Sequence, residues 1–323
     1  MSTGESVQSV AIKPFAVVFP GQGSQSVGML RDFMSNPQVA QTFAEANEAL
    51  GYDLQDVVLN GPEDKLNQTE VTQPAILTAS IAAYRALRAQ FPEYVPTACA
   101  GHSLGEYSAL VAAEALPFAD AVRLVRLRGQ LMQAAVPAGT GAMMAILGLA
   151  DADVVAGCAE ISTPDNGVWA ANFNSPGQVV ISGAKDAVQR AGEFFKEKGA
   201  RRCVPLAVSV PSHCPMMQSA ADKLKEALAE ITISEAKLQV YANVLATPVT
   251  SKDDIVDCLV RQLVGSVRWT ETVQNMKAAG IEALLEVGPG KVLTGLNRKI
   301  DKSLKLANVA SADDLDNVQS VLQ

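Results

Sequence analysis

The chain has 323 residues, 48% of them hydrophobic and 19% charged, which is typical of a globular protein with a large apolar core. Its net charge of -8 argues against nucleic-acid binding, because neutralising phosphates requires a basic surface. No apolar run approaches the length needed to span a bilayer, so we expect no association with a membrane.

The N-terminal residues Met1–Gln8 are polar and lack both the charged and the apolar regions of a signal peptide. We assign residues 1–14 no role. Apolar residues 16–19 then predict a buried strand that ends at Pro20-Gly21. A second apolar strand, at residues 97–100, leads directly into Gly101-His102-Ser103-Leu104-Gly105. Helical periodicity predicts helices at 39–50, 75–90, 106–115 and 118–135.

The middle of the chain has a different order of elements, β-α-β-β-α-β, which is that of a ferredoxin-like unit. We therefore predict a small subdomain at residues 137–206. It is inserted into a large catalytic α/β subdomain made of residues 1–136 and 207–323. The expected elements of the insertion are strand 141–149, helix 151–161, strands 169–173 and 178–182, helix 187–198 and strand 202–208.

Strands and helices alternate again after the insertion. Because this alternation occurs on both sides of the insertion, it predicts a largely parallel sheet and the α/β class. The expected elements are helix 215–231, strand 238–243, helix 255–263 and strand 283–287.

The five cysteines stand at positions 99, 158, 203, 214 and 258. Their number is odd and their spacings match no metal site. This favours scattered core thiols in a reducing cytoplasm.

The motif Gly101-x-Ser103-x-Gly105 has the G-x-S-x-G form and lies between a strand and a helix, the context in which it presents a nucleophile. The glycines permit a tight turn that lifts the serine hydroxyl above the sheet. The following helix directs its free N–H groups and positive end toward the same place, so the N–H of Leu104 is placed to bind an oxyanion. The alternative is a Gly-rich turn whose serine only caps a helix.

A serine hydroxyl needs a nearby base, and the chain has only two histidines. His102 adjoins Ser103, so its side chain should diverge from the hydroxyl, and we assign it a bracing role. His213 follows the strand-like residues 206–210 and precedes a helix, where α/β sheets present catalytic groups. The alternative for His213 is a helix-capping or surface residue. No carboxylate stands out to orient it, and a backbone carbonyl is the other acceptor available.

Arg128 falls on the apolar face of its helix. The i, i+3, i+4 rule places it there with Ala121, Leu124, Val125 and Met132. A buried guanidinium must be paired. Its partner is either a protein carboxylate or a substrate carboxylate bound bidentately, and spacing alone leaves both open.

Several motifs in one order now point to a family. They are Phe19-Pro20-Gly21-Gln22-Gly23-Ser24-Gln25, Gly101-His102-Ser103-Leu104-Gly105-Glu106, Arg128-Gly129, Pro211-Ser212-His213 and Glu286-Val287-Gly288-Pro289-Gly290-Lys291. From about residue 15 to residue 308, the chain closely resembles the malonyl-CoA:acyl carrier protein transacylases of bacterial fatty acid synthesis. The resemblance implies an α/β-hydrolase-like large subdomain with a parallel sheet and an inserted ferredoxin-like small subdomain.

The resemblance also implies the roles of individual residues. Ser103 is the acylated residue, and His213 is its general base and acid. Arg128 clamps the malonyl carboxylate. The N–H groups of Gln22 and Leu104 form the oxyanion hole, and the backbone carbonyl of Gln262 orients His213.

The implied partners are malonyl-CoA and acyl carrier protein, in a cytoplasmic ping-pong reaction. Coenzyme A enters as a substrate thioester, and no metal or redox cofactor is implied. Three alternatives are a serine esterase or thioesterase, a polyketide-type acyltransferase and a non-catalytic carrier-binding protein. Arg128 argues against a plain esterase, and the presence of both Ser103 and His213 argues against a non-catalytic protein. The residues do not separate fatty acid from polyketide synthesis, or malonyl from methylmalonyl.

Overall fold

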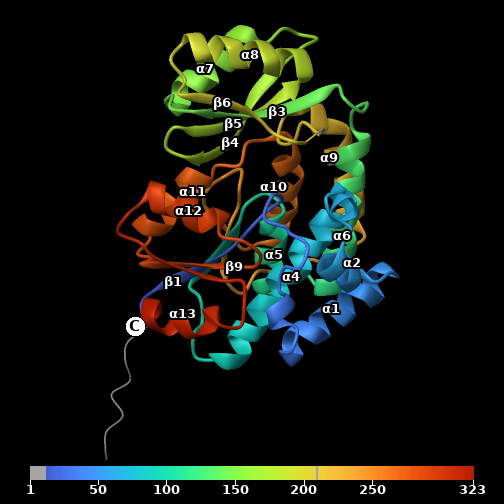
Figure 1. Cartoon of the computed structure of the whole chain (residues 1–323), viewed down its shortest axis with the longest axis vertical. Coiled ribbons are helices and arrows are strands. Elements are labelled where there is room, and N and C mark those ends of the chain that lie inside the picture. The colour runs from blue at the N-terminus through green and yellow to red at the C-terminus, as the bar shows by residue number, and fades with distance from the viewer. Residues whose placement is uncertain (1–11, 209) are drawn as a thin grey trace, which may run out of the picture.

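The computed structural model describes residues 12–208 and 210–323, so the expectation for Met1–Gln8 lies outside the described residues. Two sheets organise the chain (Figure 1). The larger one lies among helices in the lower part of the molecule, and the smaller one lies above it under its own pair of helices.

The large sheet has six strands in the order β10-β9-β1-β2-β7-β8. Every neighbouring pair is parallel except β7 and β8, which form an antiparallel edge. The prediction of a largely parallel sheet is therefore confirmed. The strands are β1 (Phe15–Phe19), β2 (Ala98–Gly101), β7 (Gln239–Tyr241), β8 (Pro248–Val249), β9 (Ala283–Val287) and β10 (Lys305–Val309).

Helices cover both faces of this sheet, which explains why its central strands are apolar without alternation. Val17 and Phe19 of β1 face one core, whereas Ala16 and Val18 face a second core together with Trp269. The helices are α1 (Pro37–Leu50), α2 (Leu54–Asn60), α3 (Glu63–Leu66), α4 (Thr69–Gln90), α5 (Gly105–Ala112), α6 (Phe118–Ala134), α9 (Gln218–Ala229), α10 (Lys252–Val264), α11 (Trp269–Ala278), α12 (Val292–Ile300) and α13 (Asp314–Leu322).

The small sheet is antiparallel, with the order β4-β5-β3-β6. Helices α7 and α8 cover its outer face (Figure 1), which gives the ferredoxin-like arrangement predicted from the sequence. Its elements are β3 (Gly141–Leu147), α7 (Asp151–Ile161), β4 (Val168–Ser175), β5 (Gln178–Ala184), α8 (Lys185–Glu197) and β6 (Arg202–Pro205). The bounds 137–206 for this subdomain remain our proposal.

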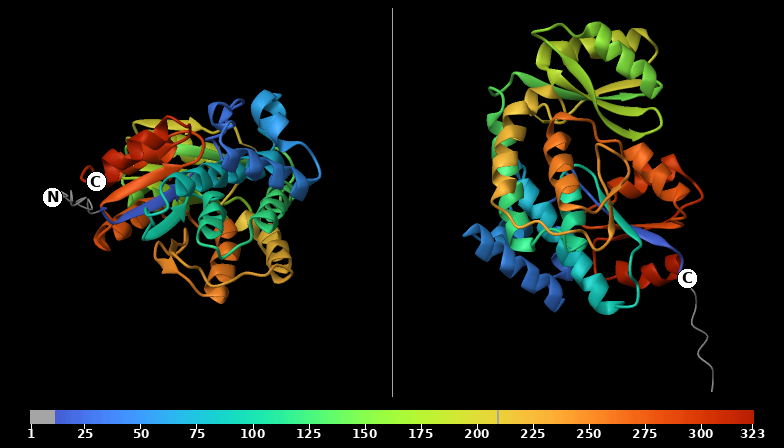
Figure 2. Two further views of the ribbon diagram at one scale, coloured as in Figure 1. Left: turned by 90° about the horizontal axis from the view of Figure 1, so that it is seen from below. Right: turned by 180° about the vertical axis from the view of Figure 1, so that it is seen from behind.

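Strand β4 joins the small subdomain to the large one. The N–H of Phe173 donates to the carbonyl of Val267 at 2.9 Å, and the hydroxyl of Thr270 donates to the carbonyl of Phe173 at 3.1 Å. Both partners lie at the start of α11. The two subdomains therefore meet along a hydrogen-bonded seam, and Figure 2 shows the small one set on one end of the large one.

The strand expected at residues 202–208 is shorter than predicted. Strand β6 ends at Pro205, and Leu206 and Val208 are exposed in the loop that returns to the large subdomain. The prediction that His213 follows a strand at residues 206–210 is wrong, because the described residues of that segment form no strand. The apolar alternation around Leu206 reflects a loop that borders a cleft, so its apolar side chains do not belong to a buried strand face.

Candidate active site

The turn between β2 and α5 presents Ser103 in the left-handed region, with φ of 51°. A Cβ atom on Gly101 would lie 1.9 Å from the carbonyl carbon of Gly105, and one on Gly105 would lie 2.1 Å from the carbonyl oxygen of Phe19. Only glycine fits at either position. The turn is thus packed against β1, with the serine at the carboxyl ends of the parallel strands, where α/β folds place their sites.

His213 lies beside this serine. Its Nε2 atom is 2.7 Å from Ser103 Oγ, and its Nδ1 atom is 2.7 Å from the backbone carbonyl oxygen of Gln262 in α10. The carbonyl can only accept, so it selects the tautomer with a proton on Nδ1 and leaves Nε2 free to accept from the hydroxyl. Burial lowers the pKa of His213 to about 3, and the charge of Arg128 adds to this effect. The imidazole is therefore neutral at neutral pH, as a general base must be.

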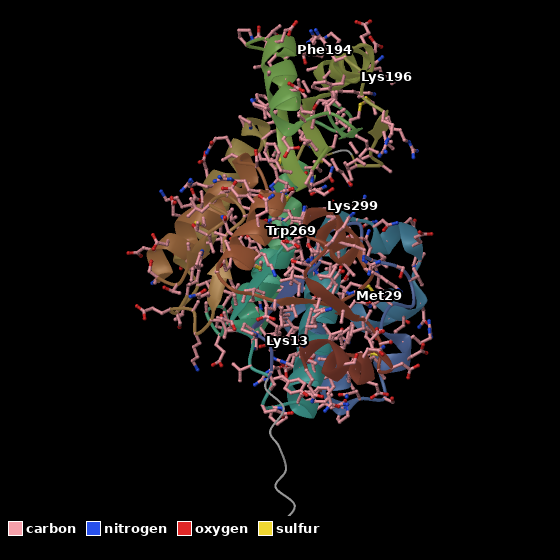
Figure 3. The ribbon with its side chains drawn as sticks, turned by 90° about the vertical axis from the view of Figure 1, so that its left-hand side faces the viewer. Lys13, Met29, Phe194, Lys196, Trp269 and Lys299 are labelled. Carbon is pink, nitrogen blue, oxygen red and sulfur yellow. The ribbon has the colours of Figure 1, made fainter. Side chains whose placement is uncertain are left out.

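His102 points elsewhere. Its Nε2 atom is 2.7 Å from Asn174 Oδ1 in β4, and its ring is 5.8 Å from the ring of Trp269. Trp269 lies near the junction of the two subdomains (Figure 3). The structure thus brings His213, and not His102, to the Ser103 hydroxyl.

Arg128 projects from α6 and is 1% exposed. Its Nη1 atom donates to Gln73 Oε1 at 2.8 Å, and its Nη2 atom donates to Gln262 Oε1 at 2.9 Å and to Ser103 Oγ at 3.2 Å. Within the described residues, no carboxylate oxygen lies within 4.0 Å of this guanidinium. A buried cation is thus held next to the serine by two amide oxygens and the serine hydroxyl, all of them neutral.

Two backbone N–H groups border the same space. Gln22 follows β1 and Leu104 precedes α5, and both line the cleft around Ser103. Neither N–H donates to a protein acceptor in the described part of the chain. They are therefore available to a ligand oxygen at this cleft.

The cleft has a volume of about 720 Å³ and lies between the two subdomains. The large subdomain contributes Ser103, Arg128 and His213 to its wall, and strand β4 of the small subdomain contributes Asn172 and Asn174. This volume is in the range of sites that enclose small molecules. The floor of the cleft is the serine itself.

Residues 12–208 and 210–323 contain no group of three or more histidine, cysteine or acidic side chains arranged to hold a metal ion. In the same part of the chain, no helix combines the length and apolar character required to cross a bilayer.

Comparisons with known proteins show the family of this chain. The model of the acyl transferase domain family matches residues 16–319. The malonyl CoA-acyl carrier protein transacylase of Escherichia coli K12 is 56% identical over 291 residues, which are 90% of this chain and 94% of that protein. The chain belongs to the malonyl CoA-acyl carrier protein transacylase family.

Solved structures of this family are similar over the whole fold. An acyl carrier protein S-malonyltransferase from Vibrio cholerae is 54% identical, with a TM-score of 0.92, and the match covers 95% of this chain and all of that one. A malonyl-transacylase in complex with its type II PKS acyl-carrier protein is 50% identical, with a TM-score of 0.91, and covers 96% of this chain and 99% of that one.

Sequence reasoning missed three buried polar residues around the transacylase site. Asn243 accepts from the N–H of Ser103 at 2.8 Å and donates to the carbonyl of Gly101 at 2.7 Å, so it braces the turn. Gln73 holds Arg128, and Glu106 contacts both Asn243 and Gln262. Asn243 is a polar side chain in the otherwise apolar stretch 240–245, which is a signal that would have found it, whereas Gln73 and Glu106 stand among other polar residues.

Proposed function

We propose that this chain transfers a malonyl group from malonyl-CoA to the phosphopantetheine thiol of acyl carrier protein, through a malonyl-serine intermediate, in fatty acid biosynthesis. In this proposal Ser103 is the nucleophile and His213 the general base and acid. Arg128 binds the malonyl carboxylate, Gln22 and Leu104 supply the oxyanion hole, and the Gln262 carbonyl orients His213.

One observation carries the substrate assignment: the buried Arg128 guanidinium beside Ser103 has no carboxylate partner among the described residues. A buried guanidinium without a direct carboxylate partner is costly, and a malonyl carboxylate can pair with it through bidentate hydrogen bonds. A serine esterase with a neutral acyl group has no use for this cation, so the esterase alternative is disfavoured.

In the first half-reaction, Ser103 Oγ attacks the thioester carbonyl carbon while His213 Nε2 takes the hydroxyl proton. The carbonyl oxygen becomes an oxyanion and accepts from the N–H groups of Gln22 and Leu104. When the tetrahedral intermediate collapses, the carbon–sulfur bond breaks. Coenzyme A leaves as the thiol with the proton from His213, and the malonyl group remains on Ser103 as an ester.

The second half-reaction runs the same chemistry in reverse. His213 takes the proton of the carrier thiol, and the sulfur attacks the malonyl-serine carbonyl carbon. The carbon–oxygen bond to Ser103 then breaks, and Oγ recovers its proton from His213. Because bonds are only exchanged between oxygen and sulfur, the proposed reaction calls for no metal or redox cofactor.

Carrier protein and compartment belong to the same proposal. The relatives named above include one in complex with an acyl-carrier protein, which supports a carrier as the second substrate. The carrier of fatty acid synthesis and a type II polyketide carrier can be compared directly as acceptors from the loaded enzyme. We further propose a cytoplasmic location, supported by five cysteines without a disulfide partner.

The proposal is tested by competition between labelled malonyl-CoA and acetyl-CoA for Ser103, read by mass spectrometry. The wild type should load malonyl preferentially, and Ser103→Ala should load neither group. Arg128→Ala should reduce the malonyl-over-acetyl ratio by about tenfold or more, because charge-assisted hydrogen bonds are lost. Arg128→Lys should rescue little, since an ammonium cannot reproduce the planar fork. If Arg128→Ala keeps the wild-type ratio, the carboxylate is bound elsewhere and the substrate assignment fails.

A further inference from the structure

A buried acid lies three residues beyond the serine. Glu106, in the first turn of α5, is 2% exposed. Its Oε2 atom accepts from the backbone N–H of Asn243 at 3.0 Å and from Gln262 Nε2 at 2.8 Å. The proposed mechanism gives this carboxylate no step, so its place beside the site requires a separate explanation.

The Gln262 side chain stands between this acid and Arg128. Its Nε2 atom donates to Glu106 and, at 3.0 Å, to the carbonyl of Ser103, while its Oε1 atom accepts from Arg128 at 2.9 Å. An amide has a donor end and an acceptor end, whereas Glu106 Oε2 accepts both of its hydrogen bonds. Burial raises the pKa of Glu106 to about 7, although its bonds from Asn243 and Gln262 and the charge of Arg128 oppose this. If the amide were reversed, its NH₂ group would face the guanidinium and its oxygen would face the carboxylate. Glu106 and the Ser103 carbonyl, which both accept from Nε2, therefore fix which end of Gln262 faces Arg128.

Glu106 also acts on the charge of Arg128 without covering its donors. Glu106 is close enough to affect the guanidinium electrostatically, yet no carboxylate in the described residues lies within 4.0 Å of it. A direct ion pair would occupy the donors that a substrate carboxylate needs. The Gln262 amide takes only one hydrogen bond from Nη2, and the buried Nε–H of Arg128 has no hydrogen-bond partner among the described residues.

We propose that Glu106 is a positioning residue for acyl selectivity: its carboxylate orients the Gln262 amide, and this amide holds Arg128 toward a carboxylated acyl group. The inference rests on the proposed malonyl transfer. It makes Glu106 a determinant of which acyl group is loaded, and not only of stability.

The experiment is the malonyl-CoA and acetyl-CoA competition for Ser103, run on Glu106→Ala and Glu106→Gln. The alanine variant should lose the orienting acceptor, and its malonyl-over-acetyl ratio should fall about tenfold, the usual effect of one charge-assisted hydrogen bond. The glutamine variant keeps an acceptor oxygen of the same reach. Its ratio should remain within about threefold of the wild type.

The chain offers a matched control in Glu286, a second buried acid, which is 1% exposed in β9. It accepts from the N–H groups of Leu293 and Thr294 at the start of α12 and contacts none of the proposed catalytic residues. Glu286→Ala should reduce the stability of the fold, measured by denaturant unfolding, and leave the malonyl-over-acetyl ratio at the wild-type value. A fall in this control would mean that the ratio reports stability alone, which overturns the proposal.

The possible outcomes distinguish a failure of the role of Glu106 from a failure of the proposed malonyl transfer. If the wild type loads no malonyl group, the proposed function fails. If the wild type is selective but Glu106→Ala keeps the ratio, or Glu106→Gln loses as much as alanine, the orienting role fails alone. Should Glu106→Ala be unfolded or load neither group, Gln262→Met takes its place, because it keeps the carbonyl that His213 contacts. Its ratio should fall about tenfold, and an unchanged ratio or equal loss of both groups overturns the proposal.

Discussion

His213 shows how burial prepares a single side chain for its task. Its ordinary pKa of 6.5 is lowered to about 3, first by burial and then by the charge of Arg128. In the unfolded chain the ring binds a proton below about pH 6.5. The stability contributed by the neutral ring is therefore fully present above that pH and is lost as the pH falls toward 3.

We accordingly predict that neither histidine of the folded protein titrates near pH 6.5. Burial also lowers the pKa of His102, although its bond to Asn174 opposes this. The check is an NMR titration of the ring signals between pH 8 and the onset of acid unfolding, with His102→Ala to assign the two. A His213 signal with a midpoint near its ordinary value would mean that the ring is solvated, and the proposed neutral base would lose its physical basis.

A site residue could be predicted from the sequence when the pattern that identifies it lies within a few neighbouring residues. Ser103 stands in a contiguous motif, Arg128 interrupts an apolar stripe, and His213 is one of only two histidines. Gln262 was implied only by the resemblance, because every residue has a backbone carbonyl and the sequence does not indicate which one contacts His213. Glu106 was missed as a functional candidate because its partner Gln262 is 156 residues away, and such pairs become visible only in the folded chain.

At the scale of elements, the turn between β2 and α5 depends on contacts between backbones. Gly101 and Gly105 approach so closely that a Cβ atom on the first would overlap the carbonyl group of the second. We predict that Gly101→Ala lowers the free energy of unfolding by about 2–3 kcal/mol, the cost of overpacking a rigid site, and reduces acylation of Ser103. Denaturant unfolding and mass spectrometry measure the two effects.

The control is another glycine, in α12. Gly295 lies within this helix, and a Cβ atom added there would meet no other atom within 4 Å. Gly295→Ala should raise the free energy of unfolding by about 0.5–1 kcal/mol, because alanine restricts the unfolded chain and favours the helix. Wild-type stability in Gly101→Ala would show that the turn tolerates a side chain, against the packing described above.

Element boundaries were predicted less well than element types, and α4 shows why. Its apolar periodicity suggested a start at residue 75, directly after Pro74, but the helix begins at Thr69 and contains that proline. Pro74 is the sixth residue of the helix, past its first turn, so α4 lacks one i→i−4 hydrogen bond, the one to the carbonyl of Glu70. The residues that the prediction left out of this helix include Gln73. This side chain is one of the two amides that accept hydrogen bonds from Arg128.

At the scale of the whole molecule, the cleft around Ser103 is lined by residues of both subdomains. The order of elements was sufficient to predict the insertion, because helices and strands in the order β-α-β-β-α-β can pack into few compact arrangements. It did not predict the seam between Phe173 and Val267, because pairing between distant strands and loops leaves no local pattern. The cleft, its volume and the contribution of β4 follow from that seam.

The remaining prediction concerns the carrier protein, in a chain whose net charge is -8. Carrier proteins of this kind are acidic, so a local basic surface should speed encounter. Our candidates are Arg201 and Arg202 at the start of β6, which are exposed and form no ion pair within the described residues. Reversing both charges, in Arg201→Glu/Arg202→Glu, should slow malonyl transfer to the carrier about tenfold at low ionic strength.

That loss should shrink as salt is added, because exposed charges are screened, and transfer to free pantetheine, a neutral acceptor, should be unchanged. Lys277→Glu/Lys305→Glu is the matched control. This double variant changes the net charge by the same amount. Lys305 is the first residue of β10, at the amino ends of the parallel strands, whereas Ser103 lies at their carboxyl ends. Lys277 lies near the end of α11. Equal slowing in both double variants would assign the effect to total charge. Transfer by Arg201→Glu/Arg202→Glu at the wild-type rate would remove these arginines from the docking surface.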